Sequence, residues 1–299
     1  MDVEELAGED SGVPLLNVLV ASEVALSFAL LIGAGLMIRT LLSLHGVDPG
    51  FHAVNALHTQ IVLSPSQYTP DWQVSFFGQA IDRVRSLPGV TAVSVVMCLP
   101  LSGSCWSNPA EIEGRSARAT QEQSEVNFNA VAPGYFRTLG VPLLQGRDFE
   151  QRDTKDALTV AIVSQSFVRR FLAREDPIGK RIRERSPKAQ TPWATIVGVV
   201  GDIRRDSLDS PAATEVYLPF TQSPINFMSL VVRGTTNQAG LASAIRTELH
   251  SLDSAVPVQA IGTMEERRSR DWLRVNCPPY FWQYSLHWPS RSRWSGSTE

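Results

Sequence analysis

Two acids and two bases lie close together in the short segment GDIRRD, where Asp202 and Asp206 flank Arg204 and Arg205. Carboxylates held beside cations can exchange protons in general acid–base catalysis when their environments move their pKa values apart. Four charges within five residues are more typical of a solvated turn, because charged side chains are rarely buried. We therefore expect a solvated charged turn here and assign these residues no catalytic role.

Two glycine-containing segments carry part of a phosphate-binding pattern. Gly198 and Gly201 follow a β-rich run, but no helix signal comes after them, so a phosphate turn is not expected. Gly179-Lys180 is followed by Arg181 and lacks the upstream glycine of G-x-x-x-x-G-K-[ST]. The chain therefore carries no P-loop for ATP.

The histidines and serines show no catalytic or metal-binding spacing. Neither H-E-x-x-H nor G-x-S-x-G occurs in the sequence. We assign no catalytic, cofactor-binding or metal-binding residue, expect no cofactor, and do not expect an enzyme. The five histidines considered are His45, His52, His58, His250 and His287.

The three cysteines are Cys98, Cys105 and Cys277, an odd number without C-x-x-C spacing. They define neither a zinc site nor a disulfide framework. Cys98 and Cys105 lie close enough in sequence to bridge in an oxidising compartment, but we expect two free thiols.

The element that organises the chain is an apolar run from Leu15 to Leu42, which carries no charge between Val24 and Ile38. About 20 apolar residues cross the ~30 Å hydrocarbon core at 1.5 Å per residue. Glu23 and Arg39 would then lie near opposite interfaces. We predict a transmembrane helix over residues 15–44, with the lipid bilayer as its partner.

Two other interpretations of this run agree less well with the sequence. A buried helix of a soluble protein seldom runs this long without a polar face. A cleaved signal peptide should begin with a positive segment, whereas residues 1–14 form an acidic leader with no Lys or Arg. Glu23 could instead be an intramembrane carboxylate facing a partner helix, although an interfacial position is expected.

The composition after the apolar run is that of a folded domain. The chain of 299 residues is 43% apolar and 19% charged, and its net charge is −3. Disorder is not expected from these values, and no strong field would recruit nucleic acid.

Strand–helix–strand units occur at both ends of the predicted domain. The first combines a strand at 56–63, a helix at 70–87 and a strand at 90–99. The last is expected to combine strands Met228–Val232 and Val256–Ala260 with the intervening helix Ala239–Leu252. Two similar units with an irregular insertion between them suggest a duplicated fold.

The composition changes again after Met264. Residues 265–299 contain four of the seven tryptophans and many Arg and Ser residues, without period 2 or 3.6. A nucleic-acid platform and an interfacial membrane segment were considered, but an irregular, unstructured tail is expected.

Several long strings resemble MacB/FtsX-type ABC transporter permeases, in the order of that family, from Leu16 to Arg267. The chain is most similar to the duplicated permeases abundant in acidobacteria. The strings are ASEVALSFALLIGAGLMIRTLLSL, RVRSLPGV, LPLSG, VAPGYFRTLGVPLLQGRDF, VAIVSQSFVRRF, EDPIGKRI, TIVGVVGDIR, EVYLPF and LDSAVPVQAIGTMEER.

The resemblance implies an α+β fold, with one N-terminal transmembrane helix before a MacB-like periplasmic core domain at 45–264. This domain would consist of porter-like βαβ units and an inserted second lobe. It also implies a permease component for efflux or mechanotransmission in the bacterial inner membrane, single-pass in this chain, with the large domain in the periplasm. The implied partners are a separate ABC ATPase subunit, a second permease copy and a periplasmic protein. The alternative is a single-span periplasmic binding or adaptor module without transport.

The sequence departs from the family pattern in two places. Three further helices follow the periplasmic domain in the family, whereas this chain leaves the pattern after Arg267, so we expect a truncated form produced by a frameshift or premature end. The acidic leader opposes the positive-inside tendency. We follow the family and expect the leader on the cytoplasmic side.

Overall fold

The chain separates into two compact units, Met1–Val47 and Asp48–Glu299. For the first and last helices, side chains are described only over 17–36 and up to residue 270. The computed structural model describes residues 13–45, 48–103, 106–115, 125–185, 191–235 and 238–276.

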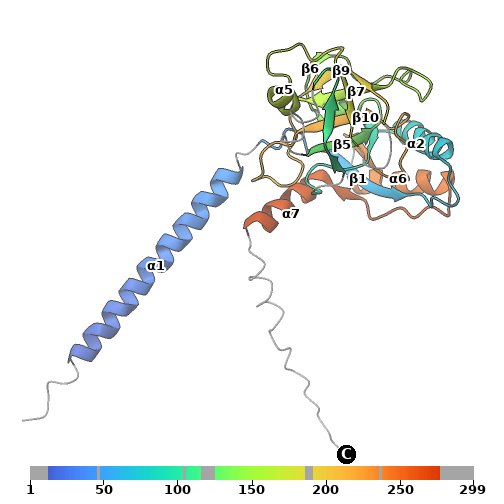
Figure 1. Cartoon of the computed structure of the whole chain (residues 1–299). Coiled ribbons are helices and arrows are strands. Elements are labelled where there is room, and N and C mark those ends of the chain that lie inside the picture. The colour runs from blue at the N-terminus through green and yellow to red at the C-terminus, as the bar shows by residue number, and fades with distance from the viewer. Residues whose placement is uncertain are drawn as a thin grey trace, which may run out of the picture. The chain divides into compact units, whose positions relative to one another are not determined.

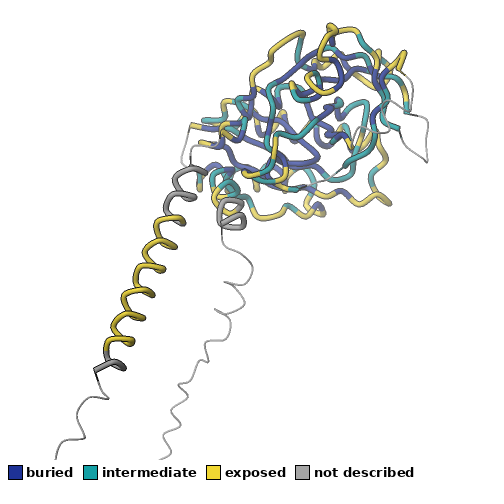
Figure 2. The backbone as a smooth tube through the Cα atoms, turned by 60° about the vertical axis from the view of Figure 1, so that its left-hand side comes forward, coloured by how far each residue is buried: buried dark blue, intermediate teal, exposed yellow. Residues whose placement is uncertain are grey.

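The first unit is the single helix α1, Val13–His45. Its segment Asn17–Leu36 has a mean hydropathy of 2.0, is long and apolar enough to cross a membrane, and exposes every described side chain (Figure 2). The Ser27 hydroxyl donates to the Glu23 carbonyl at 2.8 Å, so its polar group is satisfied inside the helix. The predicted apolar helix is confirmed, whereas most of the expected leader, residues 1–12, lies outside the described residues.

The second unit is built on one mixed sheet of twelve strands within the described residues, and the predicted α+β class is confirmed (Figure 1). The strand order is β12-β1-β11-β2-β5-β10-β7-β9-β8-β4, with β3 also paired to β5 and β6 to β9. The strands are β1 Ala56–Val62, β2 Val90–Val96, β3 Ser107–Asn108, β4 Ala110–Ile112, β5 Val126–Val131, β6 Leu143–Gly146, β7 Val160–Ser164, β8 Arg181–Glu184, β9 Ala194–Val200, β10 Glu215–Pro219, β11 Phe227–Gly234 and β12 Gly262–Thr263. The helices are α2 Pro70–Arg85, α4 Tyr135–Leu139, α5 Gln165–Phe171, α6 Gln238–Leu252 and α7 Met264–Asn276.

The first half of the sheet is a layer of strands covered on one face by α2 and α6. Thr69 caps α2 by accepting from the Trp72 amide, and Pro70 occupies the first turn, where a missing N–H costs nothing. The apolar stripe of α2, including Phe77 and Val84, packs on alternate residues of β1, β2 and β11 together with apolar side chains of α6. The predicted first strand–helix–strand unit is confirmed.

The predicted closing strand Val256–Ala260 is wrong. Of these residues only Val258 forms an isolated bridge, to Ile61. Pro257 has no N–H to donate to a ladder, which limits regular pairing at this point. The short strand β12 follows instead and pairs antiparallel with β1 at Leu57 and His58.

The second half of the sheet is formed by the inserted lobe. β5 and β10 run parallel, as do β7 and β9, and β10 pairs antiparallel with β7. The short helix α5 packs Phe167 and Phe171 onto this layer. β7 and β9 are largely apolar because side chains on both of their faces enter apolar clusters.

The two halves meet where β2 passes β5. The strands share the register pair Val96–Val131. Beyond it, the buried Asn129 side chain accepts from the Cys98 amide at 3.1 Å and donates to the Cys98 carbonyl at 3.0 Å. The side-chain amide thus extends the ladder by one step and satisfies backbone groups that water does not reach.

Helix α7 corrects the expectation for the end of the chain. Residues 265–276 are helical rather than irregular. Thr263 begins this helix by accepting from the Glu266 amide at 3.0 Å, while Glu266 accepts from the Thr263 amide at 3.3 Å, a reciprocal cap. Residues 277–299 lie outside the described residues.

Two glycines with positive φ, Gly179 and Gly146, allow the cost of a strained backbone to be measured apart from the cost of steric crowding. We expect Gly179→Ala (φ +83°, open space around it) to lose about 1–2 kcal/mol of unfolding free energy from the left-handed backbone alone. Gly146→Ala (φ +73°) should lose clearly more, because its Cβ would lie 2.1 Å from the Val197 carbonyl oxygen. Denaturant unfolding of both variants measures the difference, and equal losses would contradict this packing.

Candidate functional site

Asp202, at the start of the charged turn, binds the N-terminal turn of α5 and does not form an acid–base pair. Its carboxylate accepts from the Ser166 amide at 2.6 Å in the first turn of α5 and pairs with Arg169 at 2.5 Å. An anion at this position is stabilised by free backbone amides and the helix dipole. The Asp202 carboxylate is therefore held at the start of α5, while Gly198 lies within β9 and pairs with Gly146 of β6.

Arg205 is buried, so the expectation of a solvated turn is wrong for this residue. Its side chain is 1% exposed and pairs with Glu215, which is 3% exposed and also accepts from the Tyr217 hydroxyl. Burial is the strongest single influence and would lower the pKa of Arg205, but the Glu215 charge, the two neighbouring tyrosines and the hydrogen bond to Glu215 together outweigh it, and the pKa is raised. Burial first, then the Glu215 charge, raise the pKa values of Tyr135 and Tyr217. The cluster is a fixed ion pair with protonated tyrosines around it.

The lysine of the Gly179-Lys180 segment is engaged by an acid. Its ammonium group lies 2.6 Å from Glu175, which also pairs with Arg115 at 2.5 Å. Gly179 forms the turn before β8. The segment thus forms a turn in which Lys180 is paired with an acid.

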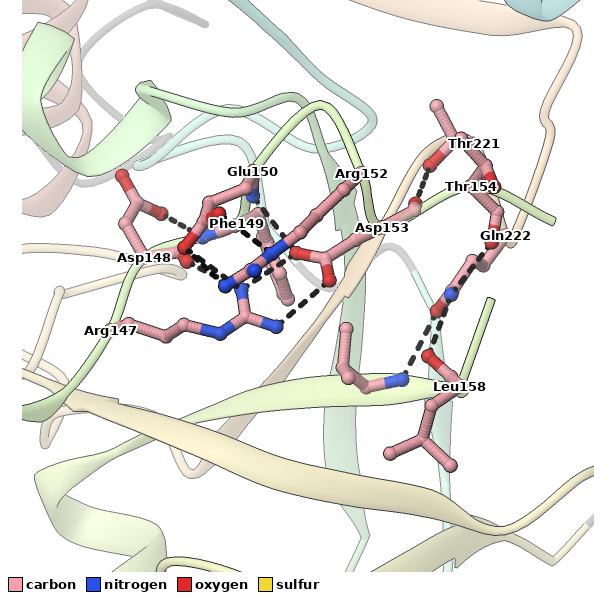
Figure 3. A network of polar contacts seen from close by, with 11 residues as sticks. Arg147, Asp148, Phe149, Glu150, Arg152, Asp153, Thr154, Leu158, Thr221 and Gln222 are labelled. Atoms are coloured by element: carbon pink, nitrogen blue, oxygen red, sulfur yellow. Dashed lines mark hydrogen bonds and ion pairs between the residues drawn. The ribbon is translucent and has the colours of Figure 1, made fainter. Parts of the chain in front are cut away.

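A second polar network lies in the segment that follows β6 (Figure 3). Arg147 donates with both terminal nitrogens to the Asp153 carboxylate, each at 2.8 Å. Thr221 donates to the Asp153 carbonyl at 2.6 Å, and Gln222 donates to the Thr154 carbonyl at 2.9 Å. Sequence reasoning did not identify this network, because Arg147 and Asp153 are six residues apart and Gln222 is distant. Its contacts tie one long loop to the end of β10.

The histidines are scattered, and no group of three His, Cys, Asp or Glu side chains within the described residues could hold a metal ion. His52 and His250 are exposed. His58 is 8% exposed, and its pKa is lowered to about 4 by burial first and then by Arg267 and Arg270, with Glu266 acting in the opposite direction. The side chains of His45 and His287 are outside the described set.

Cys98 is disulfide-bonded, so the expectation of free thiols is wrong for this residue. The other cysteines, Cys105 and Cys277, lie outside the described residues. Positive φ values at Leu101 and Gly103 turn the chain soon after Cys98, a geometry that sequence spacing does not reveal. A disulfide fits an oxidising compartment outside the cytoplasm.

Together, the apolar helix and the mixed α/β unit describe a membrane-anchored protein with a folded extramembrane domain. The family described as "MacB-like periplasmic core domain" matches residues 24–248. The chain belongs to this family of permease domains.

Relatives and a solved structure agree with this assignment. The macrolide export ATP-binding/permease protein MacB of Hahella chejuensis is 30% identical over 144 residues, which are 46% of this chain and 21% of that protein. MacB of Acinetobacter baylyi is 25% identical over 141 residues, 47% of this chain and 18% of that protein. The matches thus span about a fifth of the relatives' length.

The fold itself is shared with a solved domain. The periplasmic region of MacB from Actinobacillus actinomycetemcomitans superposes with a TM-score of 0.51 at 15% identity, over 76% of this chain and 97% of that one. The predicted resemblance to MacB/FtsX-type permeases is confirmed.

The buried ion pair gives a stability prediction. Arg205→Met leaves the Glu215 carboxylate uncompensated in the interior and should lower the free energy of unfolding by about 3–5 kcal/mol. In the double variant Arg205→Met/Glu215→Gln most of this loss should be recovered, because a neutral amide still accepts from Tyr217. Denaturant unfolding is the measurement. The control is Lys155→Met at the exposed pair with Asp71, which should change little; an equally small effect at Arg205 would contradict the assignment.

His58 gives a pH prediction. Its pKa is about 4 in the folded protein against 6.5 for an ordinary histidine. Between these values the unfolded chain binds a proton that the folded protein does not, so stability falls as the pH is lowered from 7 to 4, by about 3 kcal/mol at most. His58→Gln should flatten this slope in unfolding curves taken across the range, whereas His250→Gln, at an exposed site, should not. An unchanged slope in His58→Gln would show that another group is responsible.

Proposed function

We propose that this chain acts as a membrane-anchored permease component of a MacB/FtsX-type ABC transporter, in efflux or mechanotransmission. The observation that carries this proposal is the extent of the family match. It begins at residue 24, inside the apolar segment of α1, and continues through the α/β unit to residue 248. The helix and the domain therefore belong to one inherited unit rather than to an accidental fusion.

ATP hydrolysis is assigned to a separate ATPase subunit. The relatives are named ATP-binding/permease proteins, which supports an ATP-binding partner for the permease domain. In this proposal, the ATPase binds on the cytoplasmic side and moves the membrane helices. The domain follows that movement and engages a second permease copy or a periplasmic protein.

The proposed location is the bacterial inner membrane, with a single pass in this chain and the large domain in the periplasm. The helix length supports a full crossing. The disulfide at Cys98 supports an oxidising compartment for the domain.

Purification from the native membrane tests the proposal. The tagged full chain, extracted in mild detergent, should bring with it ATP hydrolysis and a P-loop subunit identified by mass spectrometry. Leu30→Arg combined with Ile32→Arg should abolish both, because each arginine at the centre of a membrane helix costs about 2.5–3.5 kcal/mol. Leu158→Arg, the same substitution at a side chain 68% exposed on the domain, is the matched control.

The contrary result has a clear meaning. The permease proposal would be overturned if the unmutated chain is found in the membrane fraction, purifies in detergent as a single monodisperse species, and brings no ATPase with it. That result would favour the anchored binding or adaptor module.

A further inference from the structure

One face of the β1–β11–β2 layer is covered by α2 and α6, but the opposite face contains a cavity. Side chains alternate along a strand: Leu57 and Ile61 of β1 enter the core beneath α2 and α6, so His58 and Gln60 point to the other side. Ser229 of β11 lies beside them. These residues line a cavity of 270 Å³ that is also bounded by α7. This volume is far above the roughly 10–15 Å³ that one water needs.

His58 presents an unpaired polar atom to this cavity. Its side chain is more than nine-tenths buried, and its Nε2 atom has no hydrogen-bond partner among the described residues. A buried polar group without a partner costs about 1–3 kcal/mol, so such atoms in a native structure need an explanation. A ligand group in the cavity would supply the missing hydrogen bond.

Arg267 brings a positive charge from α7 to the same cavity. Its Nε atom is buried and also lacks a partner among the described residues, while one terminal nitrogen donates to the Leu101 carbonyl at 3.4 Å. Burial and the nearby Arg270 lower the pKa of Arg267. The neighbouring acid, Glu266, lies near His58 and accepts from the Thr263 amide, but it does not line the cavity. The guanidinium thus faces the cavity with a hydrogen-bond donor unused.

The rest of the lining is neutral. Gln60, Gln259 and Ser102 add amide and hydroxyl groups, and Met97 and Phe227 add apolar surface. A phosphate dianion is usually held by several cations or by a forked arginine contact. A single guanidinium among neutral polar and apolar groups is better matched to one negative charge on a partly apolar molecule.

We propose that this cavity binds the carboxylate of a small, partly apolar molecule, held by Arg267 and His58 between α7 and β1. The carboxylate accepts from the Nε–H groups of both side chains, and the short hydrocarbon part lies against Met97 and Phe227. The proposal does not depend on the transport function, because it rests on the cavity and its two unpaired atoms. Occupancy also links α7 to the sheet through the ligand.

Butanoate and its neutral isostere butanamide are the probes. Saturation-transfer NMR on the full chain in detergent should show saturable butanoate binding. Arg267→Gln should weaken it about ten- to a hundred-fold, the range for a hydrogen bond to a charged group. Arg268→Gln, the same charge change one residue along α7, is the matched control and should bind as the parent does. Butanamide should bind at least ten-fold more weakly than butanoate.

The controls keep each outcome decisive. Ser229→Val suits a strand, narrows the cavity without changing charge, and should also abolish binding, so the test does not depend on Arg267→Gln folding. If both variants keep the thermal unfolding transition of the parent, misfolding is excluded as the cause of their lost butanoate binding. Absence of saturable binding, equal binding of butanamide, equal loss in Arg268→Gln, or tighter binding of inorganic phosphate would each overturn the proposal.

Discussion

The seam between β2 and β5 is the constraint on which the domain depends. Two half-sheets with separate apolar cores meet there, and the strands share the register pair Val96–Val131. Backbone groups beyond this pair are buried and must still be hydrogen-bonded. Asn129 meets that requirement at Cys98 with one side chain. The orientation of the inserted lobe is therefore fixed by a few directional bonds above a shared core that includes Val131 and Tyr217.

The parts of the fold with strong local signals were predictable from the sequence. The apolar run of α1 and the helix α2, with Pro70 at its start, both appear as expected, because length, periodicity and capping are local properties. The fold class followed from the strand–helix–strand pattern together with the family strings. The strand predicted at Val256–Ala260 does not form, because Pro257 cannot donate to the ladder even though the valines favour a strand.

The polar sites were not predictable in the same way, because neither the burial of their side chains nor the pairing between them follows from a local sequence pattern. Arg205 was expected in solvent, and nothing near it in sequence shows that Glu215 is buried beside it. His58 looked like a lone histidine, yet the fold places it against Arg267, more than 200 residues away. Helix α7 also lacks an apolar stripe strong enough to be recognised, although its first residue, Met264, is fully buried. Such pairings arise only from the tertiary structure.

The shortness of β12 has a mechanical consequence. Its ladder with β1 contains two register pairs, Leu57–Thr263 and His58–Gly262, whereas β1 and β11 share seven. The β12–β1 ladder therefore has far fewer backbone hydrogen bonds to lose than the β1–β11 ladder. Local opening is cheapest where the fewest bonds must break. The connection of α7 to the sheet therefore combines this two-pair ladder with the buried side chain of Met264, and the ladder is the part with the fewest bonds to break.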